Sequence, residues 1–383
     1  MRIVTISGPL HREFGGPPEA ATGIASALSI LGHEVKIIVC GQSTSDSLLN
    51  STFFGKLKKS STEVQILNRR TQSKYGTFLR PNEMKSVWKD FSDSDFVVLH
   101  QIFALQYLLL FPILVLMKKP FAVMPHGTLT SYQRRQHRVR KLFFSLPTFM
   151  FLKSASAIFV ATQQELKQLP TYLQVKGKVV GLGINTEINE SISASKPKQT
   201  FNLLYMGRIT KKKRLDIALQ AFASVSKKSS TLMKFIICGT GEARDVEAMK
   251  RMIIDLEIAK EVDFRGWVDF SEKEAALLES DCFILTSEDE NFAIAAAEAL
   301  SQGVPCILSS NVALSSLVVE YNAGVVFQEL NVGDIEDAIV QMSQRDGQMS
   351  RESALLAASQ ISWDVIARKW ESAILEFVKS QDS

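Results

Sequence analysis

Short apolar runs, each followed by a helical segment or a loop, alternate along the whole chain. The runs are too short for buried helices and are rich in Val, Ile and Phe, so they predict strands. In the first half they read RIVTIS, VKIIVC, FVVLH, FAVMP, AIFVA and KVVGLG, and in the second half NLLYMG, MKFIICG, VDFRGW, CFILTS and PCILSS. Strands that alternate with helices predict an α/β fold with mostly parallel sheets.

A polar stretch rich in Ser and Lys interrupts this pattern between residues 187 and 200. With 383 residues, the chain also exceeds the size at which a single hydrophobic core is usual. We therefore predict two domains, residues 1–186 and 201–362, joined by a linker over 187–200. A final helix over 363–383 has no strand after it and is expected to pack back on the first domain.

The composition is that of an ordinary soluble globular protein, with 46% hydrophobic and 22% charged residues. A net charge of +4 is too small to indicate nucleic-acid binding. The four cysteines lie in or beside apolar runs without the spacing of metal ligands, so we expect buried, reduced thiols in a cytoplasmic protein. The first residues, MRIVTISGPL, form a strand pattern and lack the features of a signal peptide.

Two apolar segments bear on membrane association. Ile102–Met117 is short for a membrane span and contains Gln106 and Pro112, so it predicts a buried helix between two strands. Arg134–Leu152 opens with five basic residues and continues with LFFSLPTFMFL, a pattern typical of amphipathic elements on anionic membranes. We expect peripheral attachment to the inner face of the cytoplasmic membrane, and a solvated basic helix face is the alternative.

Glu290 and Glu298 flank a strand-to-helix turn in CFILTSEDENFAIAAAEALSQGVPCIL. The helix is apolar on nearly every side, and a carboxylate in a buried helix is costly unless a polar group pairs with it. The amides of Phe292, Ala293 and Ile294 lie where the helix begins, and free N–H groups there favour anions. Amides for a phosphate and a carboxylate for hydroxyls suit a nucleotide sugar. A surface helix with a solvated glutamate is the alternative.

Gly207, Arg208 and Lys213 follow the first strand of the second predicted domain. Ligands of parallel sheets bind beyond the carboxyl ends of the strands, so both cations can reach one anion there. A forked guanidinium and a compact ammonium complement a diphosphate. A solvated basic loop is the alternative. Arg265 follows another strand at the same predicted edge.

In the first predicted domain, Gly15 and Gly16 follow the first strand and permit close backbone approach to a ligand. His100 and His126 both stand at the carboxyl ends of predicted strands, and of the two we favour His126 as the functional residue.

Several familiar sequence signatures are missing. No Gly-x-Gly-x-x-Gly follows a strand, and no Walker loop, zinc motif or nucleophile elbow occurs. Asp93-Ser94-Asp95 precedes its strand and so lies at the wrong end of the sheet for a metal site. We therefore expect a site without a metal and without a cofactor.

Taken together, these motifs resemble the family 4 retaining glycosyltransferases of the GT-B fold. The resemblance covers essentially the whole chain. It rests on Gly15-Gly16, Pro125-His126-Gly127, Gly207-Arg208 with Lys213, and Glu290 with Glu298 followed by Ala299-Leu300 and Gly303-Val304-Pro305. It implies two Rossmann-like domains whose mostly parallel sheets face each other across a cleft.

By this resemblance, Arg208 and Lys213 hold the donor diphosphate and Glu298 holds the ribose. Glu290 faces the transferred sugar, Arg265 lies near the base, and His126 lies near the sugar and the acceptor. The implied catalytic residues are Arg208, Lys213, Glu290 and His126, and the implied donor-binding residues are Gly15, Gly16, Gly207, Arg265, Phe292, Ala293, Ile294 and Glu298.

The implied activity is that of a retaining, metal-independent glycosyltransferase of the hexosyltransferase type. Its donor would be a UDP- or GDP-sugar. Its acceptor would be a glycan or lipid-linked glycan in cell-surface polysaccharide or lipopolysaccharide biosynthesis.

The sequence departs from the family pattern in several places, and two of them bear on the donor site. Ala293 replaces the usual glycine after Phe292, and its Cβ is expected to crowd the sugar. The loop Asn311–Ser316 lacks the Gly-Gly and Glu often found there. Two alternatives stay open: a nucleotide-sugar epimerase of the same fold, which needs no acceptor, and a non-catalytic sugar-nucleotide binding protein.

Overall fold

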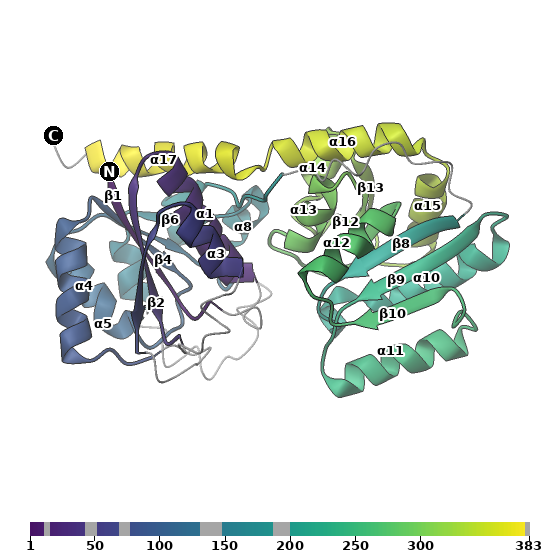
Figure 1. Cartoon of the computed structure of the whole chain (residues 1–383), viewed down its shortest axis with the longest axis horizontal. Helices are drawn as coiled ribbons and strands as arrows, with labels where there is room; N and C mark the ends of the chain where they lie inside the picture. The colour runs from purple at the N-terminus through teal and green to yellow at the C-terminus, as the bar shows by residue number, and fades with distance from the viewer. Residues whose placement is uncertain (11–15, 43–51, 69–76, 131–147, 187–199, 380–383) are drawn as a thin grey trace. The chain divides into compact units, whose positions relative to one another are not determined.

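The computed structural model describes residues 1–10, 16–42, 52–68, 77–130, 148–186 and 200–379 (Figure 1). Two compact units divide the chain. One contains Met1–Gly183 together with Trp363–Ser383, and the other contains Ile184–Ser362. Each unit is built on one parallel sheet.

The sheet of the first unit has seven strands among the described residues, in the order β3-β2-β1-β4-β5-β6-β7. They are β1 (Arg2–Ser7), β2 (Glu34–Cys40), β3 (Glu63–Leu67), β4 (Phe96–His100), β5 (Phe121–Met124), β6 (Ala157–Val160) and β7 (Gly177–Val179). The central strand β1 pairs in parallel with β2 and β4. β1 after Arg2 and all of β4 are buried on both faces, which is why these strands are mostly apolar in sequence.

Helices cover both faces of this sheet, with α4 and α5 on one face and α1 and α3 on the other (Figure 1). The helices are α1 (Gly16–Ile30), α3 (Thr52–Lys59), α4 (Pro81–Asp93), α5 (Tyr107–Leu116), a helix over 148–154, α8 (Gln163–Gln168), α9 (Thr171–Gln174) and α17 (Trp363–Lys379). α17 packs against α1. A Cβ added at Gly23 or Gly183 would lie 1.9 or 2.5 Å from the Trp363 indole, so both glycines make room for this side chain.

The sheet of the second unit has six strands among the described residues, in the order β10-β9-β8-β11-β12-β13. They are β8 (Thr200–Met206), β9 (Leu232–Cys238), β10 (Val262–Gly266), β11 (Cys282–Leu285), β12 (Cys306–Ser309) and β13 (Gly324–Phe327). Its helices are η3 (Lys211–Lys213), α10 (Leu215–Lys228), α11 (Ala243–Asp255), α12 (Phe270–Glu279), α13 (Ile294–Ser301), α14 (Ser315–Glu320), α15 (Val332–Ser343) and α16 (Gly347–Ser359). α10 packs against α11 and α15, and α13 packs against α16.

The predicted α/β class with parallel sheets is confirmed, and the predicted strands are all present. The four cysteines are buried and free, as predicted. The segment Ile102–Met117 contains helix α5 between β4 and β5, again as predicted. The prediction that this helix is buried is wrong for its outer side, where Leu109, Val115 and Leu116 are exposed.

Candidate functional site

Two glycines bring the loops after β8 and β9 into close contact at the carboxyl edge of the second sheet. A Cβ added at Gly239 would lie 1.9 Å from the carbonyl oxygen of Gly207, and one at Gly241 would lie 2.1 Å from that of Ile209. Any larger residue would push the loops apart. Arg208, between the two contacted carbonyls, is exposed two residues beyond the end of β8, as predicted.

The structure brings two predicted catalytic residues together, because Lys213 forms an ion pair with Glu290. Both side chains are about one-fifth exposed (20% and 22%). The hydroxyl of Ser287 lies 3.4 Å from the same carboxylate oxygen. Lys213 ends the 3-10 turn η3, Arg214 adopts a left-handed conformation with φ 49°, and α10 follows.

Further contacts fix this ion pair by joining residues 211–214 to the acidic loop over 286–290. The Thr286 hydroxyl donates to the carbonyl of Lys213 at 3.0 Å, and the amide of Glu288 donates to the carbonyl of Lys212 at 2.9 Å. Lys212 also pairs with Asp289 at 3.0 Å. The ammonium of Lys213 therefore stands on a loop that is held at both its main chain and its side chains.

Helix α13 begins at Ile294, two residues later than the predicted start near Phe292. The reason is Ala293, whose φ of 65° and ψ of 64° are left-handed. The left-handed conformation costs an L-residue roughly 1–2 kcal/mol of conformational free energy, and only glycine, and occasionally asparagine or aspartate, adopts it routinely. The amide of Ala296 in the first turn donates to the carbonyl of Ala293 at 2.9 Å. The amides of Ile294 and Ala295 precede the first hydrogen bond of the helix, and an anion site at this end stays a prediction.

Glu298, one turn into α13, accepts a hydrogen bond from Lys273 of α12 at 2.6 Å. The carboxylate is 30% exposed, so it is partly buried and paired with a cation. Sequence reasoning did not single out Lys273. Its ammonium also lies 5.5 Å from the ring centre of Phe270. No local signal in the sequence marks it, because its contact depends on how α12 and α13 pack.

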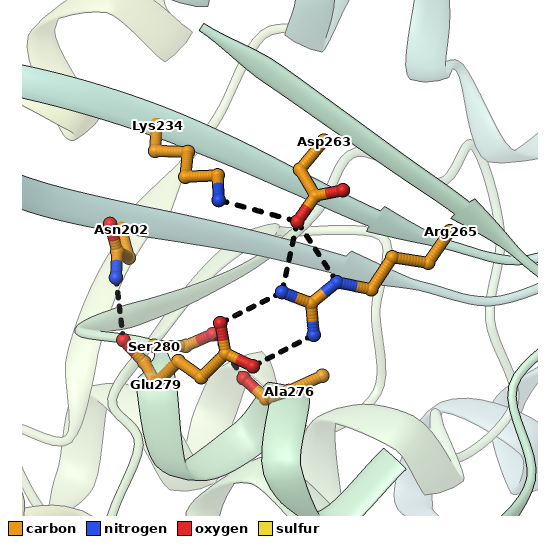
Figure 2. A network of polar contacts seen from close by, with 7 residues as sticks. All are labelled: Asn202, Lys234, Asp263, Arg265, Ala276, Glu279 and Ser280. Atoms are coloured by element: carbon orange, nitrogen blue, oxygen red, sulfur yellow. Dashed lines mark hydrogen bonds and ion pairs between the residues drawn. The ribbon is translucent and has the colours of Figure 1, made fainter. Parts of the chain in front are cut away.

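Arg265, at the end of β10, is the centre of the ion-pair network in Figure 2. Its Nε and Nη2 donate to Asp263 at 3.0 and 2.9 Å, and its Nη1 and Nη2 donate to both oxygens of Glu279 at 2.8 Å. These bonds use four of the five N–H donors that a guanidinium carries. The two carboxylates raise the pKa of Arg265, and Arg265 lowers the pKa of Glu279. The contacts hold β10 to α12.

In the first unit, His126 lies beside His100, with 2.9 Å between His126 Nε2 and His100 Nδ1 and with stacked rings. Burial lowers the pKa of His126 to about 4 and that of His100 well below its ordinary value. Both rings are therefore neutral at pH 7, and one donates to the other. Because β4 and β5 are parallel neighbours, His100 and Met124 are in register, which brings the two strand ends together.

Gly16, half-buried, is the first residue of α1. Gly15 and residues 134–147 of the predicted membrane element lie outside the described residues. Among the described residues, no three His, Cys, Asp or Glu side chains are grouped closely enough to hold a metal ion. Within the same part of the chain, no helix combines the length and hydrophobicity needed to cross a bilayer.

The two parallel sheets, each flanked by helices, have the GT-B fold, because the chain superposes over nearly its whole length on solved glycosyltransferases of that fold. Anabaena HepE, solved in complex with UDP and glucose, superposes with a TM-score of 0.72 at 14% identity, over 98% of this chain and 100% of that chain. A glycosyltransferase from Rickettsia africae superposes with a TM-score of 0.73 at 17% identity, over 99% and 98% of the two chains.

Residues 187–354 match the family Glycosyl transferases group 1. This segment contains Arg208, Lys213, Glu290 and Glu298. The alpha-monoglucosyldiacylglycerol synthase of Streptococcus pneumoniae is 30% identical over 125 residues, which are 33% of this chain and 28% of that protein. The chain therefore spans less than a third of that curated relative.

Proposed function

We propose that this chain is a retaining glycosyltransferase that moves a sugar from a nucleoside-diphosphate sugar to an acceptor hydroxyl. The observation that carries the proposal is the ion pair between Lys213 and Glu290. Glu290 is three residues before the left-handed Ala293, after which α13 begins. It joins a cation for the diphosphate to a carboxylate for sugar hydroxyls. The match to Glycosyl transferases group 1 includes both residues.

The chemistry follows from where charge develops. As the bond between the anomeric carbon and the diphosphate oxygen breaks, negative charge grows on the leaving phosphate. Arg208, Lys213 and the first amides of α13 stabilise that charge, and groups already held in place do so without reorganisation. An ammonium has three N–H donors, so Lys213 can keep Glu290 while it binds the diphosphate.

The remaining residues take supporting roles in the proposal. Glu298, held by Lys273, accepts from the ribose hydroxyls. Phe292 and Gly207 border the diphosphate, and Gly16, with Gly15 before it, borders the transferred sugar. His126, neutral because of its lowered pKa, hydrogen-bonds to the sugar or the acceptor. Cationic side chains and helix amides supply the positive charge at the diphosphate, so we propose a metal-independent reaction.

A UDP-sugar is the first donor to test, because the similar HepE structure holds UDP and glucose; a GDP-sugar is the second. The name of the streptococcal relative, alpha-monoglucosyldiacylglycerol synthase, supports a lipid-linked or cell-surface glycan as acceptor. We propose a cytoplasmic enzyme at the inner face of the membrane, in polysaccharide or lipopolysaccharide synthesis.

A thermal-shift screen of UDP- and GDP-sugars, followed by transfer assays with EDTA present, tests this function. Binding of one donor raises the apparent melting temperature, and release of its nucleoside diphosphate must depend on an acceptor. Isomerised donor formed without acceptor would instead identify an epimerase. Donor binding without turnover on a broad acceptor panel would identify a binding protein.

A further inference from the structure

The outer side of helix α5 is entirely apolar. The helix reads YLLLFPILVL, with one side packed into the core of the first unit. Its other side exposes Leu109, Pro112, Val115 and Leu116, the last with 76% of its surface in solvent. A surface helix of a soluble domain normally has polar residues on that side. An exposed cluster of large apolar side chains marks an interaction site.

Two neighbouring helices also expose large apolar side chains. Phe151 of the helix over 148–154 stacks on Phe111 of α5, with 4.5 Å between ring centres. The helix over 148–154 exposes Phe149 and Met150. The ring centre of Phe149 lies 5.0 Å from that of Tyr172 in α9. We use the name apolar face for the exposed residues Val115, Leu116, Phe149, Met150, Tyr172 and Val175.

The segments that carry the apolar face are basic. The described residues between 96 and 186 include six Lys and a single acidic residue, Glu165. Glu165 is buried and accepts from the amides of Gly127 and Ala161 at 2.7 and 2.8 Å, so it adds no exposed negative charge. Lys118 and Lys153 are exposed at the ends of their helices.

Lys153 illustrates how the cations meet the apolar residues. Its ammonium lies 5.1 Å from the ring centre of Phe149, so an aliphatic stem and a charged end share one surface. A lysine whose stem covers apolar surface and whose amine reaches outward is typical of a membrane interface. Burial, with the charge of Lys153 as a second cause, lowers the pKa of the neighbouring Lys176. Like charges therefore gather here.

We infer that the apolar face rests on an anionic lipid bilayer. The acyl region would receive the apolar side chains, and anionic headgroups would pair with Lys118 and Lys153. A second copy of the chain is a poorer occupant, because a two-fold interface would bring Lys118 and Lys153 of one copy near the same lysines of the other. The inference uses described residues outside the donor site and does not depend on the proposed activity.

Co-sedimentation of the full chain with vesicles tests the inference. Vesicles of phosphatidylcholine alone are compared with vesicles that also contain phosphatidylglycerol. We expect binding only to the second kind, and we expect added salt to weaken it. Leu116→Glu with Met150→Glu should weaken binding at least tenfold, since it places two carboxylates on the apolar face. Lys153→Ala should weaken it roughly fivefold.

The matched control is Ile254→Glu with Met349→Glu in the second unit, where the native side chains are 67% and 68% exposed. This control should bind vesicles like wild type, and thermal melting should be unchanged in every variant. Equal binding by the two double variants, or no binding to anionic vesicles, would overturn the inference. So would a dimer, measured by light scattering without lipid, that dissociates on Leu116→Glu with Met150→Glu.

Discussion

The ion pair between Lys213 and Glu290 contributes to both stability and the proposed reaction, and a double-mutant cycle separates the two. The cycle consists of Lys213→Met, Glu290→Gln and the variant with both changes. Lys213→Met leaves the Glu290 carboxylate partly buried beside the Ser287 hydroxyl at 3.4 Å. The double variant removes both charges, and therefore also the penalty of an unpaired carboxylate.

The exposure of the pair sets the expected loss of stability. Pairs on the surface contribute about 0.2–1 kcal/mol, and breaking a fully buried pair costs about 3–5 kcal/mol. With both side chains about one-fifth exposed, Lys213→Met should cost about 1–2 kcal/mol. For a domain of this size, each kcal/mol lowers the melting temperature by about 2–4 °C. The double variant should recover most of that loss.

Catalysis should behave differently. A lost donor at a developing negative charge costs about 100- to 1,000-fold in kcat. Lys213→Met and the double variant should both show this loss, although only the first is destabilised. Release of nucleoside diphosphate measures kcat, thermal melting measures stability, and Lys211→Met in the same turn is the control. A double variant with kcat close to wild type would refute the assigned role of Lys213.

Three further predictions follow from the same contacts. Because the pKa of His126 is about 4 when folded and about 6.5 when unfolded, the unfolded chain binds the proton more readily. Its stability contribution is therefore complete above pH 6.5 and falls as the pH drops toward 4. Wild type should lose about 1–2 kcal/mol more than His126→Gln between pH 7 and 5, measured by melting; parallel losses would contradict the assigned pKa. Arg265→Met should cost about 1–2 kcal/mol, since it leaves the Glu279 carboxylate without its forked partner; an unchanged melting temperature would contradict this. Ala293→Gly should raise stability by about 0.5–1 kcal/mol, as relief of the left-handed strain exceeds the entropy cost of glycine, and Ala293→Val should lower it; a destabilising glycine would show that the strain is absent.

The central strands could be predicted because burial on both faces leaves mostly apolar residues in them. β3 and β13 were not predicted, and both lie at sheet edges with half-exposed residues. Edge strands carry polar residues such as Glu63 and Gln65, so their pattern is weaker. The start of α13 was predicted two residues too early for a different reason. An alanine at position 293 gives no sign in the sequence that its backbone is left-handed.

The predicted site residues depend on topology more than on local pattern. Lys213 and Glu290 are 77 residues apart in sequence, and they meet because β8 and β11 are parallel neighbours whose carboxyl ends share one edge. The sequence indicated Lys213 and Glu290 separately, because each follows a strand whose carboxyl end lies at this edge. The partners Lys273 and Glu279 could not be predicted, because side-chain pairing between a helix and its neighbours leaves no periodic signal.

Helix α12 links two of the contacts that sequence reasoning treated separately. It carries Glu279, which binds Arg265, and Lys273, which binds Glu298. With four N–H donors already occupied, Arg265 has one left for a base. Its stronger influence on a bound donor is then indirect, since it fixes α12 and so the lysine that orients the Glu298 carboxylate. By this argument, Arg265→Met would weaken donor binding through lost contacts of Glu298 with the ribose at least as much as through a lost contact with the base.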